Sequence, residues 1–343
     1  MVGIKVYNKC EDIKSAFRQW KDLGIDTIFP YPEHAQNLEL KQYAVEYGIK
    51  LFLTIPIFHN PEYLKTNPSC YSIQADGKRA KDHWLKFICP SNKEYKNQRV
   101  DYIRNIIERF NPDGISLDFI RFFVFWEKVY VDHDPQSISQ TCFDRDCLQE
   151  FKNYSRLDFP ENPEHTADIS SRIMRNHVEK WSEWKCHVIE DTVRQISETA
   201  RKRKPEIELN IHTVPWRSED FDGALRRIAG QDLRKMSVYT DYVSPMSYSH
   251  MLKRKPAWIH SVVKDISQKT TKKIIPCVQV GNMYIDNELT SGYFEESLSQ
   301  AAKKPSYGIV LWSWKALDKS AHKKDILRKF LRDSSLSGNP DRA

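Results

Sequence analysis

The sequence contains no apolar run long enough to cross a membrane and no hydrophobic leader segment. It lacks the glycine-rich turn after an early strand that a doubly wound nucleotide-binding fold or phosphate chemistry requires. Its histidines are not grouped in a zinc-binding motif. These absences predict a soluble protein that needs no cofactor and does not act on a membrane. It would be cytoplasmic, or periplasmic or secreted if a signal peptide has been removed.

A strong excess of charge of one sign is also missing. The 343 residues include 53 Lys and Arg against 46 Asp and Glu, which gives a formal net charge of +7. Small basic clusters at 201–204 and 253–255 are not interleaved with aromatic residues, as a nucleic-acid surface would be. We therefore expect no nucleic-acid partner. A nucleic-acid-associated protein stays open as an alternative function, and it would bind nucleic acid in a strongly salt-dependent manner.

Cysteines are few and form no regular framework. The seven residues are an odd number, which fits reduced thiols better than a disulfide scaffold. Cys142 and Cys147 form the one close pair in the sequence. Because a second pair of ligands is missing beside them, we expect these two cysteines to be structural, and we expect no metal ion.

Strand-like and helix-like segments alternate along the sequence. The predicted strands are 3–7, 25–30, 50–57, 113–122, 207–212, 241–248, 273–280 and 307–314. The predicted helices are 11–23, 37–47, 91–110, 173–202, 221–236, 257–269, 291–303 and 325–331. About eight such units predict an α/β protein with a single (β/α)8 TIM barrel over residues 1–333 and a polar tail at 334–343. The long segments after the third and fourth strands, 58–90 and 123–170, are candidate functional excursions.

The fourth strand, 113–122, carries the sharpest feature of the sequence. Its apolar run places Asp118 and Arg121 where a buried strand should end. Ligands bind at the carboxyl ends of barrel strands, and a buried charge is costly unless it is used or paired. Asp118 is therefore either an active-site carboxylate or half of an ion pair with Arg121 that only fixes the strand end.

Polar and aromatic residues follow the other strands as well. The candidate substrate-binding residues are Tyr31, Glu33, His59, Arg121, His212, Trp216, Tyr248, Gln279, Asn282, Trp312 and Trp314. Such a mixture suits a sugar, whose hydroxyl rim needs polar groups and whose C–H faces pack on aromatic rings. A carbohydrate is thus the expected partner. Alternatives to sugar binding stay open for three of these residues. Trp312 and Trp314 could instead pack in the barrel core, and His212 could be a hydrogen-bonded structural residue.

The stretch 113–122 resembles the fourth-strand signature of the hypothetical glycoside-hydrolase-like barrels, which reads roughly D-G-I-x-L-D-[YF]-I-R-[YF]-P. The segment 88–92 resembles the C-P-S segment of the same family, and Cys142 with Cys147 resembles its cysteine-containing insert. The resemblance implies a barrel glycosidase in which Asp118 is the catalytic carboxylate.

Three positions depart from related patterns. Phe123 replaces the proline that usually ends the signature. Ser116 and Ile120 stand where a chitinase motif would hold an aspartate and the catalytic glutamate. Substrate-assisted chitinase chemistry is therefore not expected.

The sequence predicts hydrolysis of O-glycosidic bonds in a poly- or oligosaccharide by two carboxyl groups. Asp118 would be nucleophile or charge stabiliser, and the candidates for proton donor are, in order, Glu127, Asp286 and Glu33. Glu127 follows the aromatic run 122–126, and apolar surroundings raise the pKa of a carboxyl group. The alternative is a non-catalytic carbohydrate-binding barrel. The sugar, the stereochemical outcome and the oligomeric state stay open.

Overall fold

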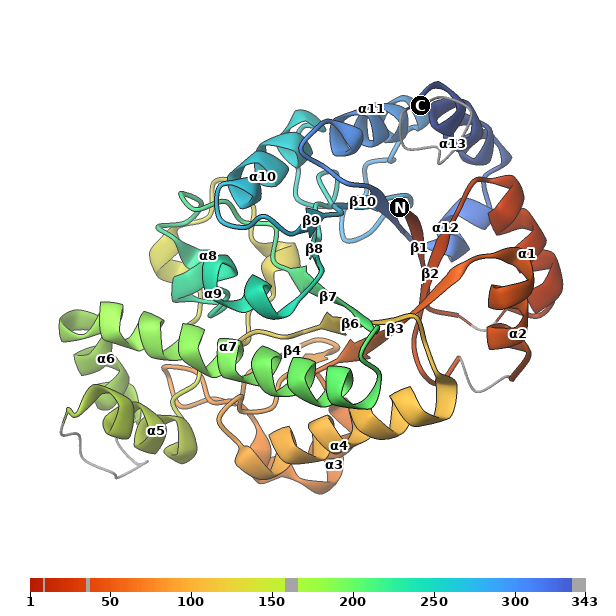
Figure 1. Cartoon of the computed structure of the whole chain (residues 1–343). Coiled ribbons are helices and arrows are strands. Elements are labelled where there is room, and N and C mark those ends of the chain that lie inside the picture. The colour runs from red at the N-terminus through yellow and green to blue at the C-terminus, as the bar shows by residue number, and fades with distance from the viewer. Residues whose placement is uncertain (9, 35–37, 158–165, 335–343) are drawn as a thin grey trace.

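The computed structural model describes all residues except 9, 35–37, 158–165 and 335–343, and it shows a parallel barrel surrounded by helices (Figure 1). The barrel strands are β1 (Val2–Val6), β2 (Thr27–Pro30), β3 (Lys50–Pro56), β6 (Gly114–Asp118), β7 (Glu208–Thr213), β8 (Tyr242–Pro245), β9 (Lys273–Ile274), β10 (Cys277–Gln279) and β11 (Ile309–Trp312). Their order in the sheet is β10-β11-β1-β2-β3-β6-β7-β8-β9.

The two ends of this sheet, β9 and β10, are consecutive in the chain and separated only by Ile275 and Pro276. The backbone N–H of Ile275 donates to Val243 O of β8 at 3.0 Å, and the N–H of Val310 in β11 donates to Pro276 O at 3.0 Å. This segment therefore joins both ends and closes the barrel. The predicted strand 273–280 is interrupted because proline has no N–H to donate. The prediction of a single (β/α)8 barrel is confirmed.

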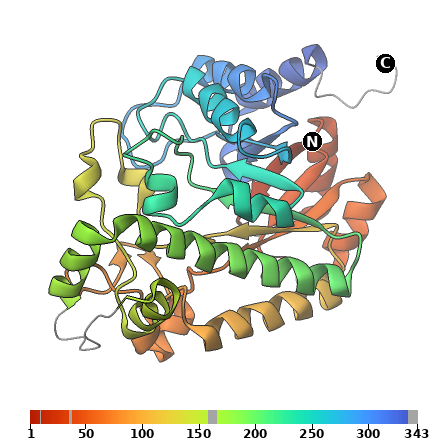
Figure 2. The same ribbon diagram turned by 60° about the vertical axis from the view of Figure 1, so that its left-hand side comes forward.

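The helices lie outside the strands and supply the apolar side chains that cover them. They are α1 (Ile13–Asp22), α2 (Leu38–Tyr47), α3 (Pro61–Thr66), α4 (Lys93–Phe110), α5 (Arg145–Ser155), α6 (Thr166–Asn176), α7 (Val178–Arg203), α8 (Ala224–Arg227), α9 (Leu233–Met236), α10 (Ala257–Ser267), α11 (Ser291–Ala302), α12 (Trp314–Asp318) and α13 (Ala321–Asp333). Figures 1 and 2 show α4 and α7 side by side. In the part of the chain that the structure describes, no helix combines the length and apolarity of a membrane span.

Several predicted boundaries were wrong. The helix predicted over 221–236 is two short helices, α8 and α9, because Gly230 lies between them in the left-handed region at φ +70°. The helix predicted over 37–47 is α2, described from Leu38 to Tyr47, and residue 37 lies outside the described residues. The eighth strand ends at Trp312, and Trp314 begins α12, where its ring packs edge-on against Trp20 at a centroid distance of 5.7 Å.

The long loops after the third and fourth strands are confirmed, and we call them the first excursion (57–92) and the second excursion (119–144). The first contains α3 and the short hairpin of β4 (Lys81–Asp82) and β5 (Leu85–Lys86); the second contains the 3-10 turn η2 (Trp126–Lys128). Both lie on the left-hand side of Figure 2. They are hydrogen-bonded to each other, since Phe143 N–H donates to Ile73 O at 2.9 Å and Ala75 N–H to Gln140 O at 3.1 Å.

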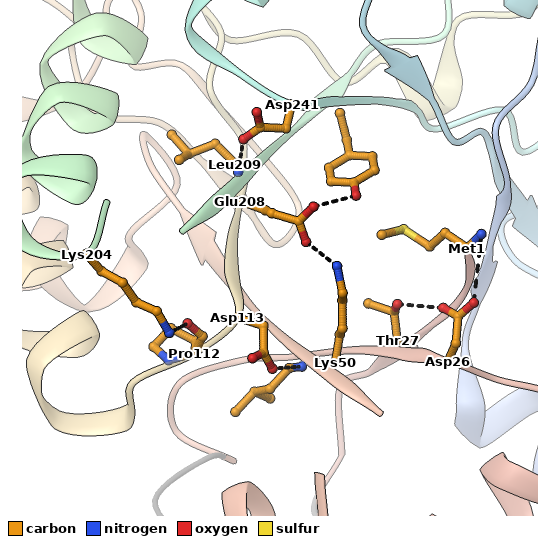
Figure 3. A network of polar contacts seen from close by, with 12 residues as sticks. Met1, Asp26, Thr27, Lys50, Pro112, Asp113, Lys204, Glu208, Leu209 and Asp241 are labelled. Atoms are coloured by element: carbon orange, nitrogen blue, oxygen red, sulfur yellow. Dashed lines mark hydrogen bonds and ion pairs between the residues drawn. The ribbon is translucent and has the colours of Figure 1, made fainter. Parts of the chain in front are cut away.

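The amino ends of the strands carry a repeated aspartate contact, which Figure 3 shows for Asp113 and Asp241. The contact occurs in the strand pairs β1–β2, β3–β6 and β7–β8 and involves an aspartate just before the second strand of each pair. The side chain of this aspartate accepts a hydrogen bond from the backbone N–H of a residue in the first strand. The backbone N–H of the aspartate donates to the carbonyl of the same residue. The N–H to Oδ2 distances are 3.0 Å for Val2 to Asp26, 2.8 Å for Leu51 to Asp113 and 2.8 Å for Leu209 to Asp241. Each aspartate therefore extends the ladder of its strand pair by one residue.

Replacing Asp113 by alanine should lower the free energy of unfolding by about 1–3 kcal/mol, because the buried N–H of Leu51 loses its acceptor. Asp113→Asn retains a side-chain oxygen and should lose less. Urea denaturation of both variants measures the difference. Equal losses would instead assign the stabilisation to the ion pair of Asp113 with Lys41, at 3.2 Å.

Candidate active site

A cavity of about 500 Å³ lies at the carboxyl ends of the strands, a volume suited to a small ligand. Strand ends and both excursions contribute its walls. The lining residues are Lys5, Tyr7, Tyr31, His59, His83, Trp84, Asp118, Phe119, Trp126, Glu127, Met246, Tyr248, Met283, Tyr284 and Trp312. The cavity therefore brings together two of the predicted carboxyl groups, those of Asp118 and Glu127.

Asp118 is the last residue of β6, and its side chain is buried. The backbone N–H of Phe119 donates to Oδ1 at 2.8 Å, and Nζ of Lys5 lies 3.9 Å from Oδ2. Burial opposes ionisation of this carboxyl, but the charges of Lys5 and Arg121 and the bond from Phe119 outweigh burial and hold the pKa of Asp118 below its usual value. Asp118 is thus an anion at neutral pH.

Lys5 was missed in the sequence, although a lysine inside the apolar strand β1 was a usable signal. Its side chain is only 1% exposed, and Asp118 is its ion-pair partner. Arg121 instead donates from Nη1 to the carbonyls of Phe122 and Val124 at 3.2 and 2.8 Å. No ion pair between Arg121 and Asp118 occurs among the described residues, and Arg121 does not line the cavity. The alternative of an ion pair between Asp118 and Arg121 is therefore wrong, and the cation that pairs with Asp118 is Lys5.

Glu127 lies in η2 of the second excursion and is 8% exposed. Its Oε2 has no hydrogen-bond partner within the described part of the chain. Burial raises the pKa of Glu127 to about 7, with Asp118 adding to the rise and Arg121 opposing it. A carboxyl group with this pKa keeps a proton near neutrality, which is the state that a general acid needs.

Aromatic rings form much of the cavity wall. Tyr248 and Trp312 stack with their centroids 4.2 Å apart, and Tyr7 stacks on Tyr31 at 4.9 Å. Trp84 of the first excursion donates its indole N–H to the Tyr284 hydroxyl at 2.7 Å. This bond links the first excursion to the loop after β10. Aromatic rings therefore bound much of the cavity, and the polar groups of Lys5, Asp118 and Glu127 lie among them.

The imidazole ring of His59 packs against this aromatic wall. Its Nδ1 lies 3.0 Å from Lys86 O, and the ring centroids of His59 and Phe119 are 4.7 Å apart. Burial lowers the pKa of His59 to about 4, so the imidazole is neutral at pH 7. Phe119 has φ +51°, in the left-handed region that non-glycine residues rarely adopt. Such local strain is typical of binding sites.

His212 lies below the cavity, in the barrel interior. Asn210 Nδ2 donates to Ser116 Oγ at 2.8 Å, and this hydroxyl lies 2.9 Å from His212 Nε2. Burial, followed by the charge of Lys5, lowers the pKa of His212 to about 3. His212 is thus a neutral, hydrogen-bonded residue of a polar layer beneath Asp118, and it does not line the cavity.

Two predicted carboxyl candidates lie elsewhere. Glu33 and Asp286 are both exposed, and neither is among the residues that line the cavity. Of the three candidates for proton donor, the structure therefore places only Glu127 beside Asp118.

Four more candidates also lie outside the cavity. Trp216 is buried against Phe221, with ring centroids 5.4 Å apart, and Trp314 packs outside the barrel as described above. Gln279 accepts the N–H of Met251 at 2.9 Å, and exposed Asn282 accepts that of Leu289 at 2.7 Å. These residues organise neighbouring loops, whereas Trp84 and Tyr284, which the sequence did not single out, reach the cavity.

No protein-family model matches the sequence, and a comparison with curated proteins finds no match either. Solved structures do match. The PgaB (BpsB) glycoside hydrolase domain from Bordetella bronchiseptica is 10% identical with a TM-score of 0.72, and the match covers 96% of this chain and 98% of that domain.

Two β-galactosidases are similar as well. The enzymes from Marinomonas ef1 and Halorubrum lacusprofundi are 11% and 13% identical, each with a TM-score of 0.70, and each match covers 96% of this chain. The chain spans 58% and 57% of their respective lengths. Together with the geometry, these likenesses show that the chain has a (β/α)8 barrel fold, which it shares with these solved structures.

Proposed function

We propose that this protein hydrolyses O-glycosidic bonds in a poly- or oligosaccharide, with Asp118 and Glu127 as the two carboxyl groups. The observation that carries the proposal is the opposite shift of their pKa values within one cavity. The pKa of Asp118 is lowered, whereas burial raises that of Glu127 to about 7. One ionised and one protonated carboxyl group at the same pH is the combination that glycoside hydrolysis uses.

In this reaction Glu127 donates its proton to the glycosidic oxygen as the bond to the anomeric carbon breaks. Asp118 either attacks the anomeric carbon, to form a glycosyl-enzyme that water hydrolyses while Glu127 takes back a proton from that water, or stabilises the oxocarbenium-like transition state and accepts the proton of a water that attacks the carbon directly. Lys5 has a positioning role, because the charge of its ammonium group lowers the pKa of Asp118 and so keeps this carboxyl group ionised. Neutral His59 adds no charge that would repel the developing cation.

The cavity wall supports a sugar as the ligand. Tyr248, Trp312 and Trp84 offer ring faces and edges on which the C–H groups of a pyranose can pack. Hydroxyls of Tyr7 and Tyr31 lie among them for the sugar rim. An extended chain fits less well than a chain end or short oligosaccharide would, given the volume of about 500 Å³.

The test is release of sugar from a panel of polysaccharides, oligosaccharides and aryl glycosides, including β-galactosides. We expect hydrolysis of at least one glycoside, with an optimum at acidic pH between the pKa values of the two carboxyl groups. If no substrate is cleaved but a glycan raises the melting temperature, the protein is a carbohydrate-binding barrel instead. In that case Glu127→Gln should leave the glycan affinity nearly unchanged.

A further inference from the structure

A second group of reactive side chains lies outside the cavity. Cys89 comes from the first excursion, just before α4, and Cys142, Asp144 and Cys147 come from the end of the second excursion and the start of α5. One ligand atom of each residue lies within 4.8 Å of those of the other three. The three cysteines are buried and Asp144 is half-buried.

The distances fit a metal ion better than a disulfide. Four ligands around a tetrahedral zinc ion, with Zn–S bonds of about 2.3 Å, stand roughly 3.8 Å apart. The Sγ atoms of Cys89 and Cys147 are 3.3 Å apart, so small side-chain rotations reach the zinc geometry. A disulfide requires about 2.05 Å, and all seven cysteines are free thiols in the structure.

The backbone around the group is arranged for thiolate and carboxylate ligands. The N–H of Ile73 donates to Cys142 Sγ at 3.2 Å, a contact that stabilises a metal-bound thiolate. The N–H of Cys147 donates to Asp144 Oδ1 at 2.7 Å, so that Asp144 caps the N-terminus of α5 with one oxygen. One carboxylate oxygen of Asp144 lies within 4.8 Å of the three sulfurs.

Lys185 supplies a fitting counter-charge. Its side chain is fully buried in α7, and its ammonium contacts Gln140 Oε1 at 3.3 Å and the carbonyl of Ile228 at 2.6 Å, which are neutral acceptors. Burial lowers the pKa of Lys185 to about 7, and negative charge on Cys142 and Cys147 opposes this shift. A zinc ion with three thiolates and one carboxylate carries a net charge of −2, which a neighbouring buried ammonium stabilises.

We propose that Cys89, Cys142, Asp144 and Cys147 form a closed, four-coordinate zinc site that fastens the two excursions together. The sequence argued against a metal because Cys142 and Cys147 had no second ligand pair nearby. The fold supplies that pair from Asp144 and from Cys89, which is far away in the sequence. With all four positions filled by protein ligands, the ion is structural and not catalytic.

The proposed zinc site would affect the active-site cavity, because it joins the two excursions that form part of the cavity wall. The first excursion carries Trp84 and the second carries Glu127, and both line the cavity. This consequence rests on the proposed function, whereas the zinc site itself does not. Metal content is therefore the primary measurement, and it separates a failure of this inference from a failure of the glycosidase proposal.

The experiment measures bound metal in protein purified with zinc, by elemental analysis, and after cobalt substitution, by thiolate-to-cobalt absorption. We expect about one zinc per chain in the wild type. Cys89→Ser and Cys147→Ser should lose most of the zinc and the cobalt band. Cys186→Ser is the matched control, since Cys186 is equally buried but lies outside the group and should keep both.

Asp144→Asn separates ligation from helix capping, because asparagine caps a helix as well as aspartate does. We expect its zinc affinity to fall by at least roughly 10–100-fold. A loss of this size already follows when a residue that only hydrogen-bonds to a metal ligand is replaced, and Asp144 would be a ligand itself. A wild-type protein that takes up neither zinc nor cobalt would overturn the inference. So would a Cys89–Cys147 disulfide found by mass spectrometry, or equal metal loss in Cys186→Ser.

Discussion

Asp118→Asn should reduce the rate of glycoside hydrolysis by at least about 10³-fold, the scale on which removal of a group that stabilises transition-state charge is felt. Asparagine has the size of aspartate and can still accept the N–H of Phe119, so the geometry around β6 is kept. What is lost is the negative charge that faces the anomeric carbon. Initial rates of sugar release on the best substrate of the panel measure the effect.

The control for this variant concerns Lys5. Its buried ammonium loses its ion-pair partner in Asp118→Asn, which should destabilise the fold by up to about 3 kcal/mol. Adding Lys5→Met should restore the melting temperature, because the unpaired charge is removed, but it should not restore hydrolysis. If the double variant regains activity, Asp118 is not the reacting carboxylate and its part is limited to pairing with Lys5.

Glu127→Gln should reduce the rate by about 10²–10⁴-fold on natural glycosides, the usual contribution of a general acid. An aryl glycoside with an acidic phenol as leaving group needs little protonation, so the loss on that substrate should be much smaller. The wild-type rate should fall as the pH rises through about 7, because Glu127 then loses its proton. In the variant this alkaline limb should be absent.

The stability of the same variant provides an independent readout. The pKa of Glu127 is raised from 4.5 to about 7 on folding. A proton bound more tightly by the folded state stabilises it fully below about pH 4.5 and stops doing so as the pH rises through 7. This contribution is worth about 3 kcal/mol. Glu127→Gln should thus melt above the wild type at pH 8; equal melting temperatures there would contradict the burial of a titrating carboxyl.

The barrel was predictable because its signal is local. The residues that determine each strand or helix are consecutive in the sequence, and the alternation of strands and helices along the chain is enough to predict the barrel. Trp314 shows the limit of this reasoning. Its spacing from Trp312 is that of residues on one face of a strand, but the chain leaves the sheet after Trp312 and Trp314 packs on Trp20 outside the barrel.

The candidate site was predictable only where one strand end or one loop determined it. Asp118 and Glu127 were found because each stands in an apolar stretch of sequence, where a charge is unexpected. The pairing of Lys5 with Asp118 and the bond between Trp84 and Tyr284 join distant segments, so no local pattern reveals them. The same holds for Cys89 and Asp144, which become neighbours only when the two excursions fold against each other.

The aspartate contacts at the amino ends of the strands have a consequence for the length of β6. Asp113 anchors one end of this strand to Leu51, and Asp118 stands at the other end, pointing inward with Ser116. Gly114 allows no side chain at its start, since a Cβ there would lie 2.4 Å from the ring of Phe52. An inserted or deleted residue between the two aspartates would reverse the alternation and turn Asp118 out of the barrel. The number of residues in β6 is thus as tightly constrained as their identity.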